Sequence, residues 1–148
     1  IFSKKYGKLL NNKSILYKTK IKSEVAESKG GYNNERRTKT LKHNEPWILQ
    51  RADPYVYRHT DGSYYFTASV PAYDGIVLRR AGTLAELSGA EEVMVWKKHE
   101  SGPMSYHIWA PEIHYLFGKW YIYFAGGEKE DIWKIRPYVL ECSGDDPL

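Results

Sequence analysis

A carboxylate held beside a proline is the first candidate for chemistry in this chain. Asp53 precedes Pro54, and the aromatic run Tyr55-Val56-Tyr57 follows. Proline fixes its own φ and disfavours the helical region for the residue before it, so we expect Asp53 to be extended at the start of a strand. A side chain held in this way can be kept in one orientation toward a bound molecule, and we therefore expect Asp53 to be the catalytic carboxylate. The plainer alternative is that Asp53 and Pro54 only begin the strand.

The pattern around Asp53 returns later in the chain. Residues 53–57 and the glycine turn at Gly62 are echoed by residues 110–114 and a second turn at Gly118. The offset is 57 residues at the proline (54 to 111) and 56 residues at the glycine (62 to 118). A period of this size, with short strands and one glycine turn in each unit, is typical of radially repeated sheets. The expected fold class is therefore all-β, a β-propeller with about one blade per repeat.

Past Trp47 the apolar residues alternate with a period of two, as they do in half-buried strands. Asp61-Gly62 supplies a turn before the run at residues 64–70, which indicates a hairpin. A longer charged loop is expected over residues 126–136. The segment 99–109 is too polar to be a strand throughout, and a loop between blades commonly lines a site. The other strands that we expect lie at residues 76–80, 93–96, 112–116, 120–124 and 137–142.

The charge of the chain is divided unevenly. Residues 1–46 hold 12 Lys and Arg against 4 acidic residues, a net +8, whereas residues 47–148 hold 10 against 14, a net −4, and the sum is the overall +4. We expect residues 1–46 to be a basic, poorly ordered tail, because they are polar and contain Gly30-Gly31 without sustained periodicity. Nucleic acid is not an expected partner, since no aromatic stacking pattern accompanies the basic residues.

Neither a membrane span nor a secretory signal is recognisable in the sequence. No apolar run is long enough to cross a bilayer, and the N-terminal segment lacks an uninterrupted apolar core with a small-residue cleavage site. The chain begins with Ile1 rather than methionine, so we expect that its first residue is not the natural start. These observations leave the cellular compartment open.

Histidine and cysteine do not form a metal signature here. His99, His107 and His114 lie near Glu112, but their spacing fits no zinc motif, so we expect no metal and no cofactor. These histidines are expected to be structural or to contact a ligand. The single cysteine, Cys142, cannot form an internal disulfide, and its place on an alternating strand predicts a buried apolar residue.

Three runs of the sequence resemble glycoside hydrolase family 43, the arabinofuranosidase and xylosidase group. The resemblance covers residues 47–148 and leaves residues 1–46 outside it. It implies a five-bladed propeller whose central pocket holds three carboxyl groups. One is an Asp general base from the first blade, which matches Asp53, and the others are a pKa-tuning Asp and a Glu general acid from later blades. The runs are Arg51-Ala52-Asp53-Pro54-Tyr55, Trp109-Ala110-Pro111-Glu112-Ile113-His114-Tyr115 and Gly118-Lys119-Trp120-Tyr121-Ile122-Tyr123-Phe124.

The chain departs from the family's pattern in its extent, because it stops near the end of the second blade. We therefore expect about two blades of a partial propeller over residues 47–148. The missing C-terminal blades and the other two carboxyl groups are expected beyond Leu148. Glu112 and Asp131 lie in the second unit, but we assign neither as the acid or the tuner. In the family, the residue after Trp-Ala-Pro lies beside the pocket without being the proton donor.

The resemblance also implies a sugar substrate, an arabinose- or xylose-containing saccharide of plant origin. Trp109 is expected to form a wall of the sugar subsite by stacking its indole on a sugar face; the alternative is that it only packs between blades. Glu112 and His107 are expected to contact the substrate as well. Arg51 lies two residues before Asp53, on the same side of an extended strand, and is expected to favour the charged form of that carboxylate.

Two functions from different classes follow. In the first, the chain is the N-terminal part of an inverting glycoside hydrolase and is inactive alone, because one carboxylate cannot act as both acid and base. In the second, it is a non-catalytic sugar-binding or interaction module on a propeller scaffold, since a fold alone does not give function. The first also predicts that the isolated chain is not a stable monomer. Apolar side chains of its second blade would partly face water, namely Trp120, Ile122, Phe124, Tyr138 and Leu140.

Overall fold

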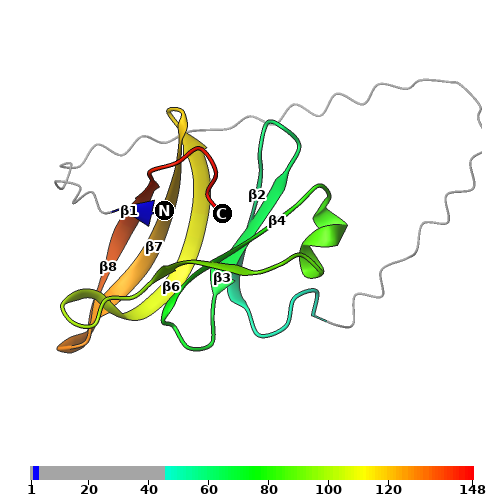
Figure 1. The fold of residues 1–148 in the computed structure, drawn as a ribbon. Helices are drawn as coiled ribbons and strands as arrows, with labels where there is room; N and C mark the ends of the chain where they lie inside the picture. The colour runs from blue at the N-terminus through cyan, green and yellow to red at the C-terminus, as the bar shows by residue number, and fades with distance from the viewer. Residues whose placement is uncertain (1, 4–45) are drawn as a thin grey trace, which may run out of the picture. The chain divides into compact units, whose positions relative to one another are not determined.

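The computed structural model describes residues 2–3 and 46–148, and these residues form an all-β structure (Figure 1). The all-β class is therefore confirmed. The expected basic tail, residues 1–46, lies outside the described residues except for residues 2–3 and 46. The elements are β1 (Phe2–Ser3), β2 (Ala52–Arg58), β3 (Tyr64–Ser69), β4 (Gly75–Ala81), the 3-10 helix η1 (Leu84–Ser88), β5 (Val93–Lys97), β6 (Pro103–Leu116), β7 (Lys119–Glu128) and β8 (Asp131–Cys142).

The strands form two four-stranded antiparallel sheets. The first sheet has the order β2-β3-β4-β5, so each strand pairs with the next one along the chain, and the second sheet has the order β1-β8-β7-β6. The strands expected at residues 64–70, 76–80 and 93–96 correspond to β3, β4 and β5. The predicted hairpin turn is also present, because the His59 amide donates to the Ser63 carbonyl oxygen (2.8 Å) and Gly62 has a φ of 92°.

The second sheet is longer than the alternation of apolar residues predicted. β6 begins at Pro103 rather than near residue 112, and only Lys129 and Glu130 separate β7 from β8. The expected charged loop over residues 126–136 is therefore wrong. Four of its six charged residues lie on strands, where they can pair across the hairpin, as Lys134 Nζ does with Glu128 Oε2 at 2.7 Å.

Both sheets bend at a bulge that follows the internal repeat. The register of β2 against β3 and that of β6 against β7 each shifts around an X-Pro pair, at residues 53–54 and 110–111. The first residue of each pair has a positive φ, 50° at Asp53 and 46° at Ala110. Our expectation that Asp53 is extended is therefore wrong. A bulge kinks its strand, and aspartate tolerates the left-handed region better than most residues do.

A hydrophobic core fills the space between the two sheets. Its second-sheet members include Trp120 (2% exposed), Ile122 (0%), Phe124 (4%) and Leu140 (2%). The expectation that these side chains partly face water is wrong, because Tyr65, Ile76 and Leu78 of the first sheet belong to the same cluster and cover them; only Tyr138 is half-buried. Burying side chains of this size stabilises the fold by about 1.5–3 kcal/mol each. Cys142 is buried in the same core, as predicted.

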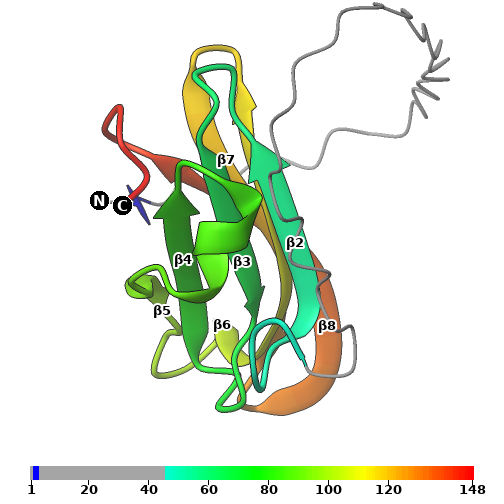
Figure 2. The same cartoon turned by 90° about the vertical axis from the view of Figure 1, so that its right-hand side faces the viewer.

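The other face of the first sheet, which we call the outer face, is covered by η1 (Figure 2). Leu87 of η1 packs against Phe66 and Ala68 of β3, and Trp47 meets the Phe66 ring edge-on at a centroid distance of 6.2 Å. β3 is therefore buried on both sides. Among the described residues, none belongs to a helix that has the length and the apolar character to span a membrane.

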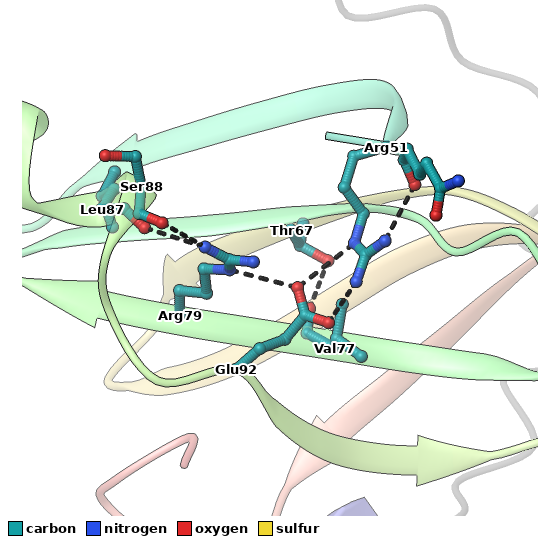
Figure 3. A network of polar contacts seen from close by, with 8 residues as sticks. Arg51, Thr67, Val77, Arg79, Leu87, Ser88 and Glu92 are labelled. Carbon is teal, nitrogen blue, oxygen red and sulfur yellow. Dashed lines mark hydrogen bonds and ion pairs between the residues drawn. The ribbon is translucent and has the colours of Figure 1, made fainter. Parts of the chain in front are cut away.

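Two arginines and one glutamate form a network on this outer face (Figure 3). Glu92, just before β5, accepts from Arg51 Nε at Oε2 (3.2 Å) and from Arg51 Nη2 at Oε1. Arg79 of β4 donates to the same Oε2 (3.1 Å) and to the carbonyl oxygens of Leu87 and Ser88. Burial raises the pKa of Glu92, but the hydrogen bonds from Arg51 and Arg79 outweigh burial, and the net pKa lies below the ordinary carboxyl value.

Candidate active site

The carboxylate of Asp53 lies at the bulge of β2 and is exposed. Its Oδ2 accepts a hydrogen bond from Ser69 Oγ of β3 at 2.8 Å. The same Ser69 oxygen accepts from the backbone N–H of Ala110 in β6, also at 2.8 Å. One serine hydroxyl therefore joins the bulge of the first sheet to the equivalent bulge of the second, and it orients a carboxylate that remains open to solvent.

Arg51 does not lie beside Asp53 as the sequence suggested; it pairs with Glu92. Its guanidinium is turned to the outer face of the first sheet, where it pairs with Glu92 and donates to the Gln50 carbonyl oxygen at 2.8 Å (Figure 3). The expected placement of Arg51 on the same side as the Asp53 carboxylate is therefore wrong. The expectation assumed an extended backbone at residue 53, and the bulge turns the two side chains apart.

An aromatic cluster lies next to Ala110 in β6. His107 stacks on Trp109 with a centroid distance of 4.4 Å and an interplanar angle of 19°. Tyr73, from the β3–β4 loop, meets Trp109 edge-on at 5.7 Å, and Trp133 of β8 meets His107 at 5.3 Å. Trp109 is half-buried, so it packs within this cluster and still presents surface to solvent.

A hydrogen bond fixes the tautomer that we assign to His107. Its Nδ1 lies 3.0 Å from the Ile132 carbonyl oxygen. A carbonyl oxygen only accepts, so Nδ1 carries the proton, and in the neutral ring Nε2 is left as an acceptor. The imidazole can therefore accept a hydrogen bond from a hydroxyl group of a ligand.

Glu112 makes its contacts away from Ser69. Its Oε2 lies 3.2 Å from His114 Nε2, and the Tyr55 hydroxyl lies 3.5 Å from His114 Nδ1. Burial raises the pKa of Tyr55, and the negative charge of Glu112 raises it further. Glu112 also lines an open groove of about 530 Å³ on the second sheet, together with Ala110, Tyr123, Phe124, Ala125, Ile135, Arg136 and Pro137.

The structure thus links Asp53, Trp109 and His107 around the Ser69–Ala110 hydrogen bond, and it pairs Glu112 with His114. The sequence carries little signal for Ser69, because its partner Ala110 is 41 residues away. The sequence also gives no sign that Tyr73 joins the aromatic cluster. Tyr73 lies in the β3–β4 loop and has a φ of 49°. An exposed, oriented carboxylate near an aromatic surface can accept a proton from a bound molecule.

No group of three or more histidine, cysteine or acidic side chains in the described part of the chain is arranged to hold a metal ion. Three of the aromatic contacts of His107 are with Tyr73, Tyr106 and Trp109. His99 Nδ1 lies 2.7 Å from the Pro103 carbonyl oxygen and His114 meets Glu112, so each of the three histidines singled out in the sequence has a protein partner.

Comparison with known proteins gives one consistent family. Residues 44–146 match the family described as glycosyl hydrolases family 43. The chain is 59% identical over 103 residues to an extracellular exo-alpha-(1->5)-L-arabinofuranosidase of Streptomyces avermitilis, covering 70% of this chain and 21% of that protein. It is 56% identical over 106 residues to the protein of the same description from Streptomyces chartreusis, covering 72% and 32%.

A solved structure shows the same similarity in three dimensions. The crystal structure of alpha-L-arabinofuranosidase from Lactobacillus brevis superposes with a TM-score of 0.63 at 53% sequence identity, and the match covers 69% of this chain and 34% of that one. The chain thus spans between about a fifth and a third of the length of the relatives it matches.

Proposed function

The chain belongs to glycosyl hydrolase family 43, and on this premise we propose that it is the N-terminal part of an inverting glycoside hydrolase that removes α-L-arabinofuranosyl residues from saccharides. Identities of 53–59% to proteins named as arabinofuranosidases support this substrate class over xylosides. The partner is then an arabinose-containing saccharide. Three residues of this chain that would contact the saccharide are Trp109, His107 and Glu112.

In this proposal the two sheets are the first two blades of a five-bladed propeller. Residues 47–148 are the part of the catalytic domain present here, and the basic residues 1–46 precede it; of these, Phe2 and Ser3 pair with β8 as strand β1. The repeated bulge at residues 53–54 and 110–111 supports the blade assignment, because it occupies the same point of both sheets. The rest of the protein supplies the remaining blades, since the chain spans only 21–34% of its relatives.

The proposed reaction needs two carboxyl groups about 6.5–9.5 Å apart on opposite sides of the scissile bond. Asp53 acts as the general base, which takes a proton from water as the water attacks the anomeric carbon. A general acid from a later blade protonates the leaving oxygen. Asp53 suits the first role because its carboxylate is exposed and already held by one hydrogen bond. This exposed, oriented carboxylate is the observation that carries the proposal.

The stereochemistry of the first product tests the proposal. In the complete enzyme, hydrolysis of an aryl α-L-arabinofuranoside is expected to release β-arabinofuranose first, because a single displacement by water inverts the anomeric carbon. Proton NMR of the anomeric signal in the first minutes measures it, and the 148-residue chain alone serves as a control that is expected to release no sugar. Initial release of the α anomer contradicts the proposed mechanism, and saccharide binding without hydrolysis favours a non-catalytic module.

Removal of the Trp109 indole is expected to weaken substrate binding. Trp109→Ala in the complete enzyme should raise KM about 2–10-fold with a smaller change in kcat, because aromatic stacking contributes about 0.5–1.5 kcal/mol. Trp109→Phe keeps a flat ring and is the matched control, with a KM close to that of the parent. Initial-rate kinetics on an arabino-oligosaccharide give both constants. An unchanged KM in Trp109→Ala would assign Trp109 to packing alone.

A further inference from the structure

We propose that Ser69 is a positioning residue that holds the Asp53 carboxylate in register with the second sheet. The inference rests on the proposed role of Asp53 as general base. Ser69 lies on β3, is 2% exposed, and makes hydrogen bonds of 2.8 Å to both Asp53 Oδ2 and the Ala110 amide. It belongs to neither bulge and contacts both.

The chemistry of the three groups fixes the direction of each hydrogen bond. A backbone amide can only donate, so Ser69 Oγ accepts from Ala110. The hydroxyl has one proton, and the carboxylate of Asp53 can only accept when it is ionised. The proton of Ser69 therefore points to Asp53 Oδ2, and the amide of Ala110 holds the hydroxyl in that orientation. A hydroxyl that is free to rotate would not direct its proton in this way.

Asp53 needs this support because the sheet gives it none. The β2–β3 ladder pairs Ala52 with Ser69 and next pairs Tyr55 with Thr67, so residues 53–54 lie in the bulge without ladder partners. The next residue is a proline, which has no amide hydrogen to donate. An exposed aspartate has a broad, roughly two-fold torsion at its carboxylate. The hydrogen bond from Ser69 is thus what sets the orientation of the carboxylate.

The same hydroxyl also connects the base to the aromatic cluster. Ala110 has a φ of 46° and lies in the gap between the ladder pairs Trp109–Ala125 and Glu112–Tyr123. Its amide is directed across to Ser69 instead of along the sheet. Trp109 is the preceding residue, so the Ser69 contact holds the base and the proposed sugar wall in one arrangement across the two sheets.

Thr67 provides a matched control for Ser69. It lies two residues earlier on β3, on the same face, and its side chain is equally buried at 0% exposure. Its hydroxyl also makes one hydrogen bond of 2.8 Å, but the acceptor is the Val77 carbonyl oxygen of the neighbouring strand (Figure 3). Removing either hydroxyl takes a buried hydrogen-bonding group out of β3, and only removal of the Ser69 hydroxyl also releases Asp53.

The test compares Ser69→Ala, Ser69→Cys and Thr67→Val in the complete enzyme, by kcat and KM on an aryl α-L-arabinofuranoside and by thermal unfolding. Ser69→Ala is expected to lower kcat about 10–100-fold with KM within about 3-fold, because orientation of the base acts on the chemical step. Ser69→Cys keeps a side chain of the same shape with a larger terminal atom that donates weakly, so kcat should fall as well. Thr67→Val is expected to lower the melting temperature and leave kcat within about 2-fold.

The inference is overturned if both Ser69 variants keep a kcat within about 3-fold of the parent, or if Thr67→Val lowers kcat as much as they do. Should Ser69→Ala fail to fold, Ser69→Cys makes the same comparison with the side-chain position still filled. Asp53→Asn in the same enzyme distinguishes a failure of the Ser69 positioning role from a failure of the proposed function. An inactive Asp53→Asn beside fully active Ser69 variants refutes only the positioning role, whereas an active Asp53→Asn refutes the proposed function.

Discussion

Replacing Asp53 with asparagine in the complete enzyme is expected to lower kcat about 10²–10⁴-fold, the usual contribution of a general base. Asparagine has the same shape, and its side-chain oxygen can still accept the hydrogen bond from Ser69 Oγ that the carboxylate accepts at 2.8 Å. The amide cannot take a proton from the attacking water. The bulge, the contact between the sheets and the binding of sugar should therefore survive while hydrolysis is lost.

The measurement needs kinetics, saccharide binding by calorimetry and thermal unfolding on the same preparation. Asp61→Asn is a suitable control, because Asp61 lies in the turn at the other end of the β2–β3 hairpin and accepts from the Ser63 amide at 2.7 Å. It removes the same charge from the same sheet and should leave kcat unchanged. If Asp53→Asn hydrolyses an aryl arabinofuranoside at nearly the parent rate, Asp53 is only a residue that begins a strand.

The repeat of the fold could be recognised from the sequence because it depends on local residue types. Proline at positions 54 and 111 and glycine at positions 62 and 118 recur at matching points of the two units, and each glycine marks a turn. Strand alternation likewise located β3, β4 and β5. These features depend on backbone restrictions of a few neighbouring residues, and such restrictions are visible in a single sequence.

The contacts around the site were less predictable because they join distant residues. Ser69 meets Ala110, and Arg51 meets Glu92, in each case 41 residues away. The left-handed backbone at Asp53 was also hidden, since a residue before proline is usually extended. A one-residue change in register turns every later side chain to the other face. The bulge therefore decided where Arg51 and Asp53 point, and the sequence alone did not reveal the bulge.

The face of the second sheet that is buried was likewise not predictable from the sequence. Alternation correctly separates Trp120, Ile122 and Phe124 from Tyr121 and Tyr123, but it does not say which face is covered. The structure buries the first set against the first sheet and leaves Tyr123 44% exposed. Trp120, Ile122 and Phe124 are thus buried by the packing of these two sheets.

The ion-pair network of Arg51, Arg79 and Glu92 on the outer face of the first sheet is expected to contribute strongly to stability. Glu92→Gln is expected to lower the free energy of unfolding of this chain by about 2–3 kcal/mol at neutral pH. Loss of one partner of a buried ion pair costs about 3–5 kcal/mol, and the lower figure applies because the side chains of Arg51, Arg79 and Glu92 keep 14–20% exposure. The change leaves two guanidiniums near each other without their shared carboxylate, and urea unfolding measures the loss.

The effect of Glu92→Gln should depend on pH in a direction that follows from the carboxyl group. Because the pKa of Glu92 lies below its ordinary value of 4.5 in the folded chain, its stabilising contribution is fully present at neutral pH and is lost as the pH falls through the folded pKa. The parent and Glu92→Gln should therefore begin to converge in stability as the pH falls below 4.5, and the difference should be lost once the pH is below the folded pKa of Glu92. Glu91→Gln, at the exposed neighbouring position, removes the same charge and should stay close to the parent at both pH values. A stability difference that is equally large in acid and at neutral pH would show that Glu92 acts through packing, and that its charge contributes little to holding the segments before β2 and β5 together.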